Sequence, residues 1–166
     1  MLVVVERVVV LGRGGAGKST TAHHLGELTG LPVIELDKHF WSADLVPLAK
    51  DAWADRQRQL AGSGRWIMDG DLGPDDVRCP RLHRADTVVI LDLSLARCAW
   101  RAVRRSRERA DFWWWLLTWR KRSRPMVLQD VAACAPQAEL HLLPSPRRVR
   151  CFLAGVAATH RRRPRT

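Results

Sequence analysis

The chain has 166 residues and a formal net charge of +11 at pH 7, a length that supports one domain and leaves no room for two ordinary ones. Hydrophobic residues make up 46% and charged residues 27% of the sequence, and no apolar run approaches the roughly 18 residues that a membrane-spanning helix needs. The first residues lack the basic region and cleavage site of a secretory signal. We therefore expect one cytoplasmic domain.

The excess of basic residues raises the question of a nucleic-acid partner, because Lys and Arg gain affinity for phosphates through counterion release. Arginine supplies nearly all of this charge, since Lys18, Lys38, Lys50 and Lys121 are the only lysines among 28 basic residues. An arginine-favouring genome would produce the same bias. We favour solvated charged faces and a site for several phosphates, and keep nucleic acid as an alternative partner.

The cysteines show no metal-binding or redox spacing. They are Cys79, Cys98, Cys134 and Cys151, far apart in the chain and without a C-x-x-C pair, so we expect reduced thiols and neither a zinc site nor a redox pair. None of the six histidines is expected to bind a metal.

Apolar runs and helical periodicities alternate along the chain. In chain order, the sequence predicts a strand over 6–11, a helix over 18–28, a strand over 31–36, a helix over 49–60, strands over 65–68 and 87–91, a helix over 95–109, a strand over 139–143 and a helix over 147–158. The alternation predicts an α/β fold of three layers with a five-stranded parallel sheet. The domain is expected to span residues 1–158, followed by a disordered basic tail over 159–166.

Ligands of such sheets bind beyond the carboxyl ends of the strands. The residues that follow the predicted strands are therefore the candidates for a site. These are the segment 12–19, Asp37, the segment 69–71 and Asp92.

The segment after the first strand satisfies G-x-x-x-x-G-K-[ST], between a strand and a helix. Its glycines let successive backbone N–H groups turn toward one anion, and the helix adds the positive end of its dipole. Lys18 is expected to reach the β- and γ-phosphates of ATP, and Ser19 to bind Mg²⁺. The expected nucleotide-binding residues here are Gly12, Gly14, Gly15, Ala16, Gly17, Lys18, Ser19 and Thr20.

The absence of Asn from the sequence excludes the N-K-x-D segment by which GTPases normally select guanine. The chain is also too short for the core of an oligomeric motor or a transporter. A small ATP-dependent phosphotransferase fits both observations.

Four segments carry a resemblance to a known family. They are GRGGAGKST (12–20), LTGLPVIELDKHFW (28–41), WIMDGD (66–71) and VVILDLSLARCAWRAVRR (88–105). Together they resemble the adenylate-kinase-like P-loop kinases, and most closely the bacterial topology modulation proteins. The similarity covers roughly residues 5 to 158 and implies a kinase fold of the nucleoside and nucleotide kinase type.

The resemblance implies roles for four further residues. Asp37 falls where the family places an acidic group facing the phosphate acceptor. Asp69 falls at the acidic position that helps to hold Mg²⁺ through water. Arg101 and Arg105 fall where the family has one arginine over the adenine and another on the transferring phosphate.

The chain also departs from the family pattern. Adenylate kinases continue D-G-F-P-R after the third strand, and that arginine grips the phosphate of AMP. Here Gly73 stands in its place, so AMP is a doubtful acceptor unless Arg78 compensates. Asp71 replaces the Asn of the topology modulation pattern. The segment between Arg105 and Trp113 is short for a lid, a role that residues 120–124 could take.

Three features have a structural alternative. Asp37 could be a helix N-cap, although we favour acceptor binding. We expect Asp92 to turn the chain into the following helix. The aromatic residues after 111 could stack nucleic-acid bases, but helical spacing favours one face buried in the core or an interface. That face comprises Phe112, Trp115, Leu116 and Trp119.

These observations predict a kinase that transfers the γ-phosphate of ATP to a small molecule or a nucleotide, with Lys18, Asp37, Arg101 and Arg105 as catalytic residues and Ser19 and Asp69 as Mg²⁺ residues. One alternative is a kinase acting on nucleic acid. Another is an ATP-binding regulatory or DNA-associated protein with little turnover.

Overall fold

A computed structural model describes residues 5–41, 46–73, 76–105 and 110–161, without the side chains of residues 105, 110 and 111. Its centre is a parallel five-stranded sheet in the order β2-β3-β1-β4-β5. The strands are β1 (Arg7–Gly12), β2 (Val33–Glu35), β3 (Trp66–Asp69), β4 (Thr87–Leu91) and β5 (Glu139–Leu143). The predicted parallel five-stranded sheet is confirmed, with every strand shifted by two residues or fewer at either end.

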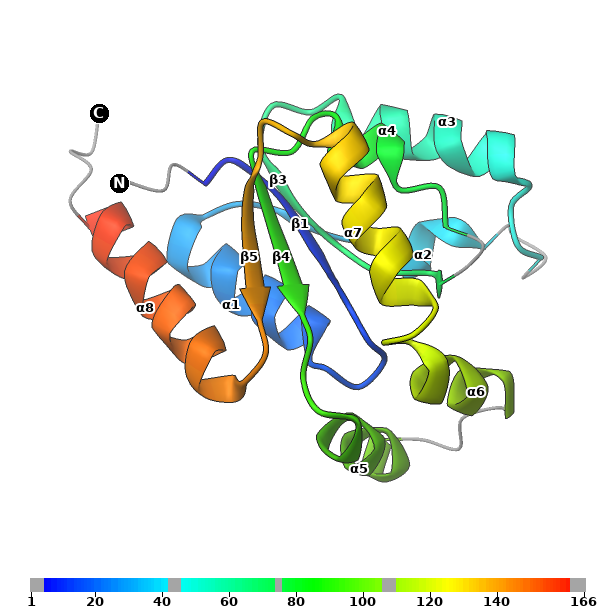
Figure 1. The fold of residues 1–166 in the computed structure, drawn as a ribbon. Helices are drawn as coiled ribbons and strands as arrows, with labels where there is room; N and C mark the ends of the chain where they lie inside the picture. The colour runs from blue at the N-terminus through cyan, green and yellow to red at the C-terminus, as the bar shows by residue number, and fades with distance from the viewer. Residues whose placement is uncertain (1–4, 42–45, 74–75, 106–109, 162–166) are drawn as a thin grey trace.

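Helices cover both faces of the sheet (Figure 1). On one face lie α1 (Lys18–Thr29) and α8 (Pro146–Arg161), and on the other lie α2 (Asp37–Phe40), α3 (Lys50–Ala61), α4 (Cys79–Leu82) and α7 (Ser123–Cys134). The remaining helices, α5 (Leu95–Arg105) and α6 (Ala110–Thr118), lie beyond the carboxyl ends of β1 and β4. The chain therefore has the expected three layers, with two extra helices at the edge where ligands bind.

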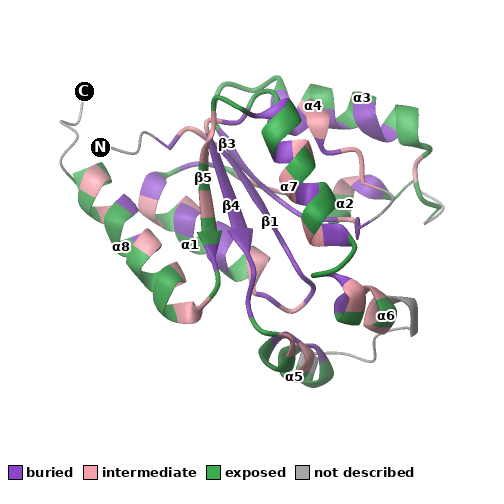
Figure 2. Ribbon diagram, in the orientation of Figure 1, coloured by how far each residue is buried: buried purple, intermediate pink, exposed green. Residues whose placement is uncertain are grey.

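The core is divided by the sheet. Along β1, Val9 and Leu11 pack into one apolar cluster and Val8 and Val10 into the other, because successive side chains of a strand point to opposite faces. Figure 2 shows the central strands buried along their length. Buried on both faces, β1 and β4 form a rigid base from which the loops at their carboxyl ends project.

Three helices, α2, α4 and α7, were not predicted. Four-residue α4 is too short to give a periodic pattern, and Pro80 and Pro125 stand in the first turns of α4 and α7, where proline is tolerated. The last helix continues to Arg161, three residues beyond the expected end of the domain. Residues 162–166 of the expected tail lie outside the described residues.

Among the helices that the structure describes, none is both long and apolar enough to cross a membrane.

Candidate active site

The loop between β1 and α1 has the backbone of a phosphate-binding turn. Gly15 and Gly17 have φ of 71° and 92°, left-handed values that favour glycine. A Cβ atom on Gly15 would collide with the carbonyl oxygen of Cys98, so α5 packs directly on the loop. The Nζ atom of Lys18 lies 3.4 Å from the carbonyl oxygen of Arg13, which holds the ammonium group over the turn.

Asp69 ends β3 and lies beside Ser19 in the first turn of α1. Burial raises the pKa of Asp69, while a hydrogen bond with Ser19 and the charge of Lys18 act in the opposite direction. The Oδ1 atom of Asp69 is buried and has no hydrogen-bond partner among the described residues. The neighbouring strands β1 and β3 thus bring together two residues that are 50 positions apart.

A pocket of about 340 Å³ opens between the loop and the helices α5 and α6. Its walls are Gly15, Gly17, Thr20, Trp100, Arg101, Ala102, Arg104 and Phe112. Arg101 enters it from α5, with its Nη1 atom 3.4 Å from the carbonyl oxygen of Ala16. The structure therefore places Arg101 against the loop. Arg105 ends α5, but its side chain lies outside the described residues.

Trp100 and Arg104 also line this pocket and were missed in the sequence. Trp100 is 60% exposed, and the guanidinium of Arg104 lies over its ring at 4.6 Å from the centroid. The sequence offered one signal for this role, an aromatic residue within an arginine-rich helical segment. That signal does not distinguish a residue of a pocket wall from one at any other surface position.

Asp37 is the first residue of α2 and follows β2 closely, so it lies on the same edge of the sheet as the phosphate loop. The N-cap of α2 is Leu36. Asp37 is exposed, in the first helical turn where a carboxylate is favoured by the helix dipole.

Arg78 is held by carboxylates and a carbonyl. Its Nη2 atom donates to Asp71 and to the carbonyl oxygen of Gly73, both at 2.7 Å, and its Nη1 atom donates to Asp130 on α7 at 3.0 Å. Although burial opposes its charge, Asp71 and Asp76 raise the pKa of Arg78. The side chain is only 2% exposed, so its guanidinium is buried and already paired with these partners.

Asp92 follows β4 and pairs with two arginines. The Nε atoms of Arg120 and Arg124 each lie 3.0 Å from one of its carboxylate oxygens. The residues considered as a lid thus hold the chain after β4 in place. This arrangement agrees with a structural role for Asp92.

Arg13 is a buried arginine of the loop that the sequence analysis did not single out. It is 1% exposed, its guanidinium lies 5.5 Å from the centroid of the Trp119 ring, and its Nε and Nη1 atoms are buried without a hydrogen-bond partner among the described residues. Burial lowers its pKa. A bound anion would compensate this charge.

The face that was expected to be buried is buried in part, because Phe112 and Trp115 are only half-buried. Leu116 and Trp119 are fully buried, whereas Trp114 points outward and is 59% exposed. A Cβ atom on Gly14 would lie 2.6 Å from Phe112 and 2.8 Å from Trp115. Helix α6 therefore packs on the phosphate loop, and only a glycine leaves room for it at position 14.

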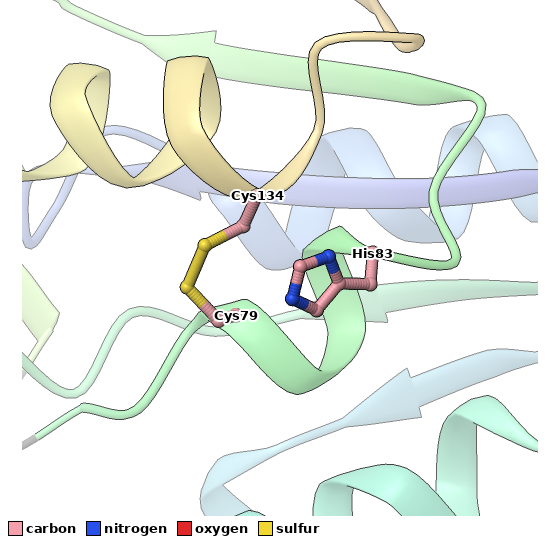
Figure 3. Close-up of side chains that lie close together, drawn as sticks. All are labelled: Cys79, His83 and Cys134. Atoms are coloured by element: carbon pink, nitrogen blue, oxygen red, sulfur yellow. A yellow bond between two sulfur atoms is a disulfide. The ribbon is translucent and has the colours of Figure 1, made fainter.

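The expectation for the cysteines was wrong in part. Cys79 and Cys134 form a disulfide between α4 and α7, and His83 lies next to it (Figure 3). Only Cys98 and Cys151 are free. The two partners are 55 residues apart in sequence, so their approach depends on the packing of α4 against α7, which spacing does not reveal.

No family profile and no curated protein sequence matches the chain, but solved structures do. A shikimate kinase from Acinetobacter baumannii in complex with shikimate matches with a TM-score of 0.62 and 16% identity, over 92% of this chain and 91% of that chain. A sugar kinase from a Janibacter species matches with a TM-score of 0.57 and 22% identity, over 93% of this chain and 98% of that chain. A deoxyadenosine kinase from M. mycoides with bound dCTP matches with a TM-score of 0.52 and 14% identity, over 91% of this chain and 98% of that chain. With its parallel sheet and glycine-rich loop, the chain has the α/β fold of the small P-loop kinases.

Proposed function

We propose that the chain is an ATP-dependent phosphotransferase of the cytoplasm. The observation that carries this proposal is the meeting of Lys18, Ser19 and Asp69 at the carboxyl edge of the sheet, next to a pocket that Arg101 enters. The kinase folds of the matching structures support it. Closeness to the topology modulation proteins is part of the same proposal.

In this proposal the phosphates of ATP lie along the segment 12–20, and the base enters the pocket. Backbone N–H groups of the loop and the ammonium of Lys18 neutralise the phosphate charge. Arg101 approaches the nucleotide from α5, and Arg105 reaches the transferring phosphate. Trp100 offers an aromatic face on which a base can stack. Catalysis then consists mainly of positioning and charge stabilisation.

The residues present fit Mg²⁺, a hard cation that takes oxygen ligands and keeps several waters. Ser19 would bind the ion directly. The buried Oδ1 atom of Asp69 needs a donor, and a water of the metal's hydration shell provides one. When bound, Mg²⁺ supplies charge neutralisation at the phosphates.

The acceptor in this proposal is a small molecule with a hydroxyl group, or a nucleotide. Asp37 would orient the acceptor group and accept its proton as the bond to phosphorus forms. The matching structures include a shikimate kinase, a gluconokinase and a sugar kinase. The buried nitrogens of Arg13 have no hydrogen-bond partner among the described residues. A phosphate of the bound substrates would supply the missing acceptor and the opposite charge.

The test is the release of ADP from ATP and Mg²⁺ in the presence of a panel of sugars, hydroxy acids, nucleosides and nucleotides. We expect one class of acceptor to stimulate ADP release and to gain a phosphate detected by mass spectrometry. Lys18→Ala should abolish the transfer and weaken ATP binding while the protein stays folded. Lys50→Ala is the matched control, because Lys50 is exposed at the start of α3. Unchanged ATP affinity in Lys18→Ala would contradict the proposal.

The net charge of +11 keeps nucleic acid in the same panel. A single-stranded oligonucleotide that accepts phosphate and binds with a strong salt dependence would favour the nucleic-acid kinase. Salt-dependent binding without any phosphorylated product would favour the regulatory protein instead.

A further inference from the structure

Three side chains outside the proposed active site lie together where α4 meets the end of α7. They are Cys79, His83 and Cys134, which we call the Cys–His cluster (Figure 3). We propose that this cluster, once its two cysteines are reduced, binds a thiophilic divalent cation of the zinc type.

The backbone brings the three ligand atoms into range of one ion. Cys79 and His83 are four residues apart, and the N–H of His83 donates to the carbonyl oxygen of Cys79 at 3.0 Å, so both side chains leave the same turn. Cys134 approaches from the last position of α7. The two sulfur atoms and a ring nitrogen all lie within 4.8 Å of one another.

These separations fit tetrahedral coordination. Zn–S bonds of about 2.3 Å and Zn–N bonds of about 2.0 Å place neighbouring ligand atoms roughly 3.3 to 3.8 Å apart. Small side-chain rotations from the observed positions therefore suffice. Figure 3 shows the imidazole of His83 beside the bridge between the sulfur atoms, with a ring nitrogen on the facing side.

The donor set also matches the chemistry of the ion. Two thiolates and an imidazole are the ligands that zinc prefers, and the two thiolate charges neutralise a divalent cation. Cys134 is buried, Cys79 is half-buried and His83 is exposed, so an ion can enter from the side of His83. A water would complete the fourth position.

Disulfide and metal exclude each other, because both use the two sulfur atoms. A phosphine reductant opens the disulfide: the phosphine is oxidised to its oxide with an oxygen from water, and two thiols form. Metal binding then releases the two thiol protons. Disulfides are rare in the cytoplasm, where we place the protein, so the dithiol is the form available to an ion there.

Either linkage ties α4 to α7 next to Arg78, which precedes Cys79 and reaches Asp130 on α7. A bound ion would thus reinforce a contact that already exists between the two helices. Binding to the folded state alone stabilises a protein. Zinc should therefore raise the thermal midpoint of the reduced protein and leave that of the oxidised protein unchanged.

The experiment uses the full chain, reduced with a phosphine that is then removed without oxygen, and titrates it with Co²⁺ as a coloured substitute for Zn²⁺. We expect one equivalent to bind, with the thiolate charge-transfer and visible bands of tetrahedral cobalt, and Zn²⁺ to displace it. Proton release should accompany binding. His83→Ala should weaken the affinity at least about tenfold, because one of three protein ligands is lost. Cys134→Ser should remove the thiolate site, and Cys151→Ser, at an exposed free cysteine, should not affect it.

A second measurement needs no variant. In the reduced wild-type protein, zinc should slow the alkylation of Cys79 and Cys134, located by mass spectrometry, without protecting Cys151. Failure of the reduced protein to bind Co²⁺ or Zn²⁺ would overturn the proposal. So would binding that Cys151→Ser abolishes, or reduction that unfolds the chain without rescue by zinc.

Discussion

The role of Arg78 can be tested by removing its side chain in Arg78→Ala. The guanidinium is 2% exposed and has hydrogen bonds with Asp71, Gly73 and Asp130 at 2.7 to 3.0 Å. We expect the variant to lose stability, because it leaves Asp71 buried beside fewer positive charges. Its acceptor preference should not move toward or away from AMP.

The magnitude follows from the burial of the pair. Removing one partner of a buried ion pair costs about 3–5 kcal/mol, and each kcal/mol lowers Tm by roughly 2–4 °C in a chain of this size. A decrease of roughly 6–20 °C is therefore expected in thermal unfolding followed by circular dichroism. Arg84→Ala is the control, because Arg84 is exposed shortly after α4, and its Tm should stay close to that of the wild type.

The same variant tests whether AMP is the acceptor. Gly73 stands where the adenylate-kinase pattern has an arginine, and a contact of that kind contributes about 1.5–3 kcal/mol, or roughly one to two powers of ten in affinity. With Arg78 already occupied, AMP should have a lower kcat/KM than the preferred acceptor at saturating ATP. The reasoning would be refuted if AMP were the best acceptor and Arg78→Ala removed that advantage without the loss of stability.

Three further predictions concern the phosphate loop and its neighbours. Arg101→Ala should weaken ATP binding by roughly 10- to 100-fold in calorimetry. Arg97→Ala should leave ATP binding unchanged, because Arg97 is exposed one turn earlier in α5. Equal effects of the two substitutions would contradict the assignment of the pocket to ATP. Arg13→Met should raise the Tm of the nucleotide-free protein, because it removes a buried charge with unpartnered nitrogens, and should reduce the further rise that ATP and Mg²⁺ produce. Finally, because burial raises the pKa of Asp69, Mg²⁺ affinity should fall as the pH is lowered through that pKa, while the stability of the metal-free protein should rise over the same interval. Asp69→Asn should remove both pH dependences. If both dependences persisted in the variant, Asp69 would be excluded as their source.

The fold and the phosphate loop could be predicted because their signals are local. Runs such as Val8–Leu11 and the glycines that follow determine a strand and a turn within a few residues. Once the strands are known to be parallel, their carboxyl ends meet at one edge. That rule alone brought Asp69 into the neighbourhood of Ser19, although 50 residues separate them.

Side-chain partnerships between distant segments required the tertiary structure. The disulfide between Cys79 and Cys134, the bond from Arg78 to Asp130 and the pairing of Asp92 with Arg124 join segments between 32 and 55 residues apart. Such contacts depend on how helices pack against each other, which no periodicity records. The Cys–His cluster arises in the same way.

The sequence by itself determined the class of fold, the position of the phosphate loop and the edge of the sheet at which it lies, because these follow from backbone geometry and from the order of the elements. The tertiary structure alone decided which charges are already paired. Arg78 and Arg101 are both arginines near a predicted site, yet Arg78 is enclosed by carboxylates and Arg101 enters the pocket beside the loop. The physical reason is that the role of a charged side chain depends on its desolvation and on its partners, and both are set by packing between segments that are distant in the chain.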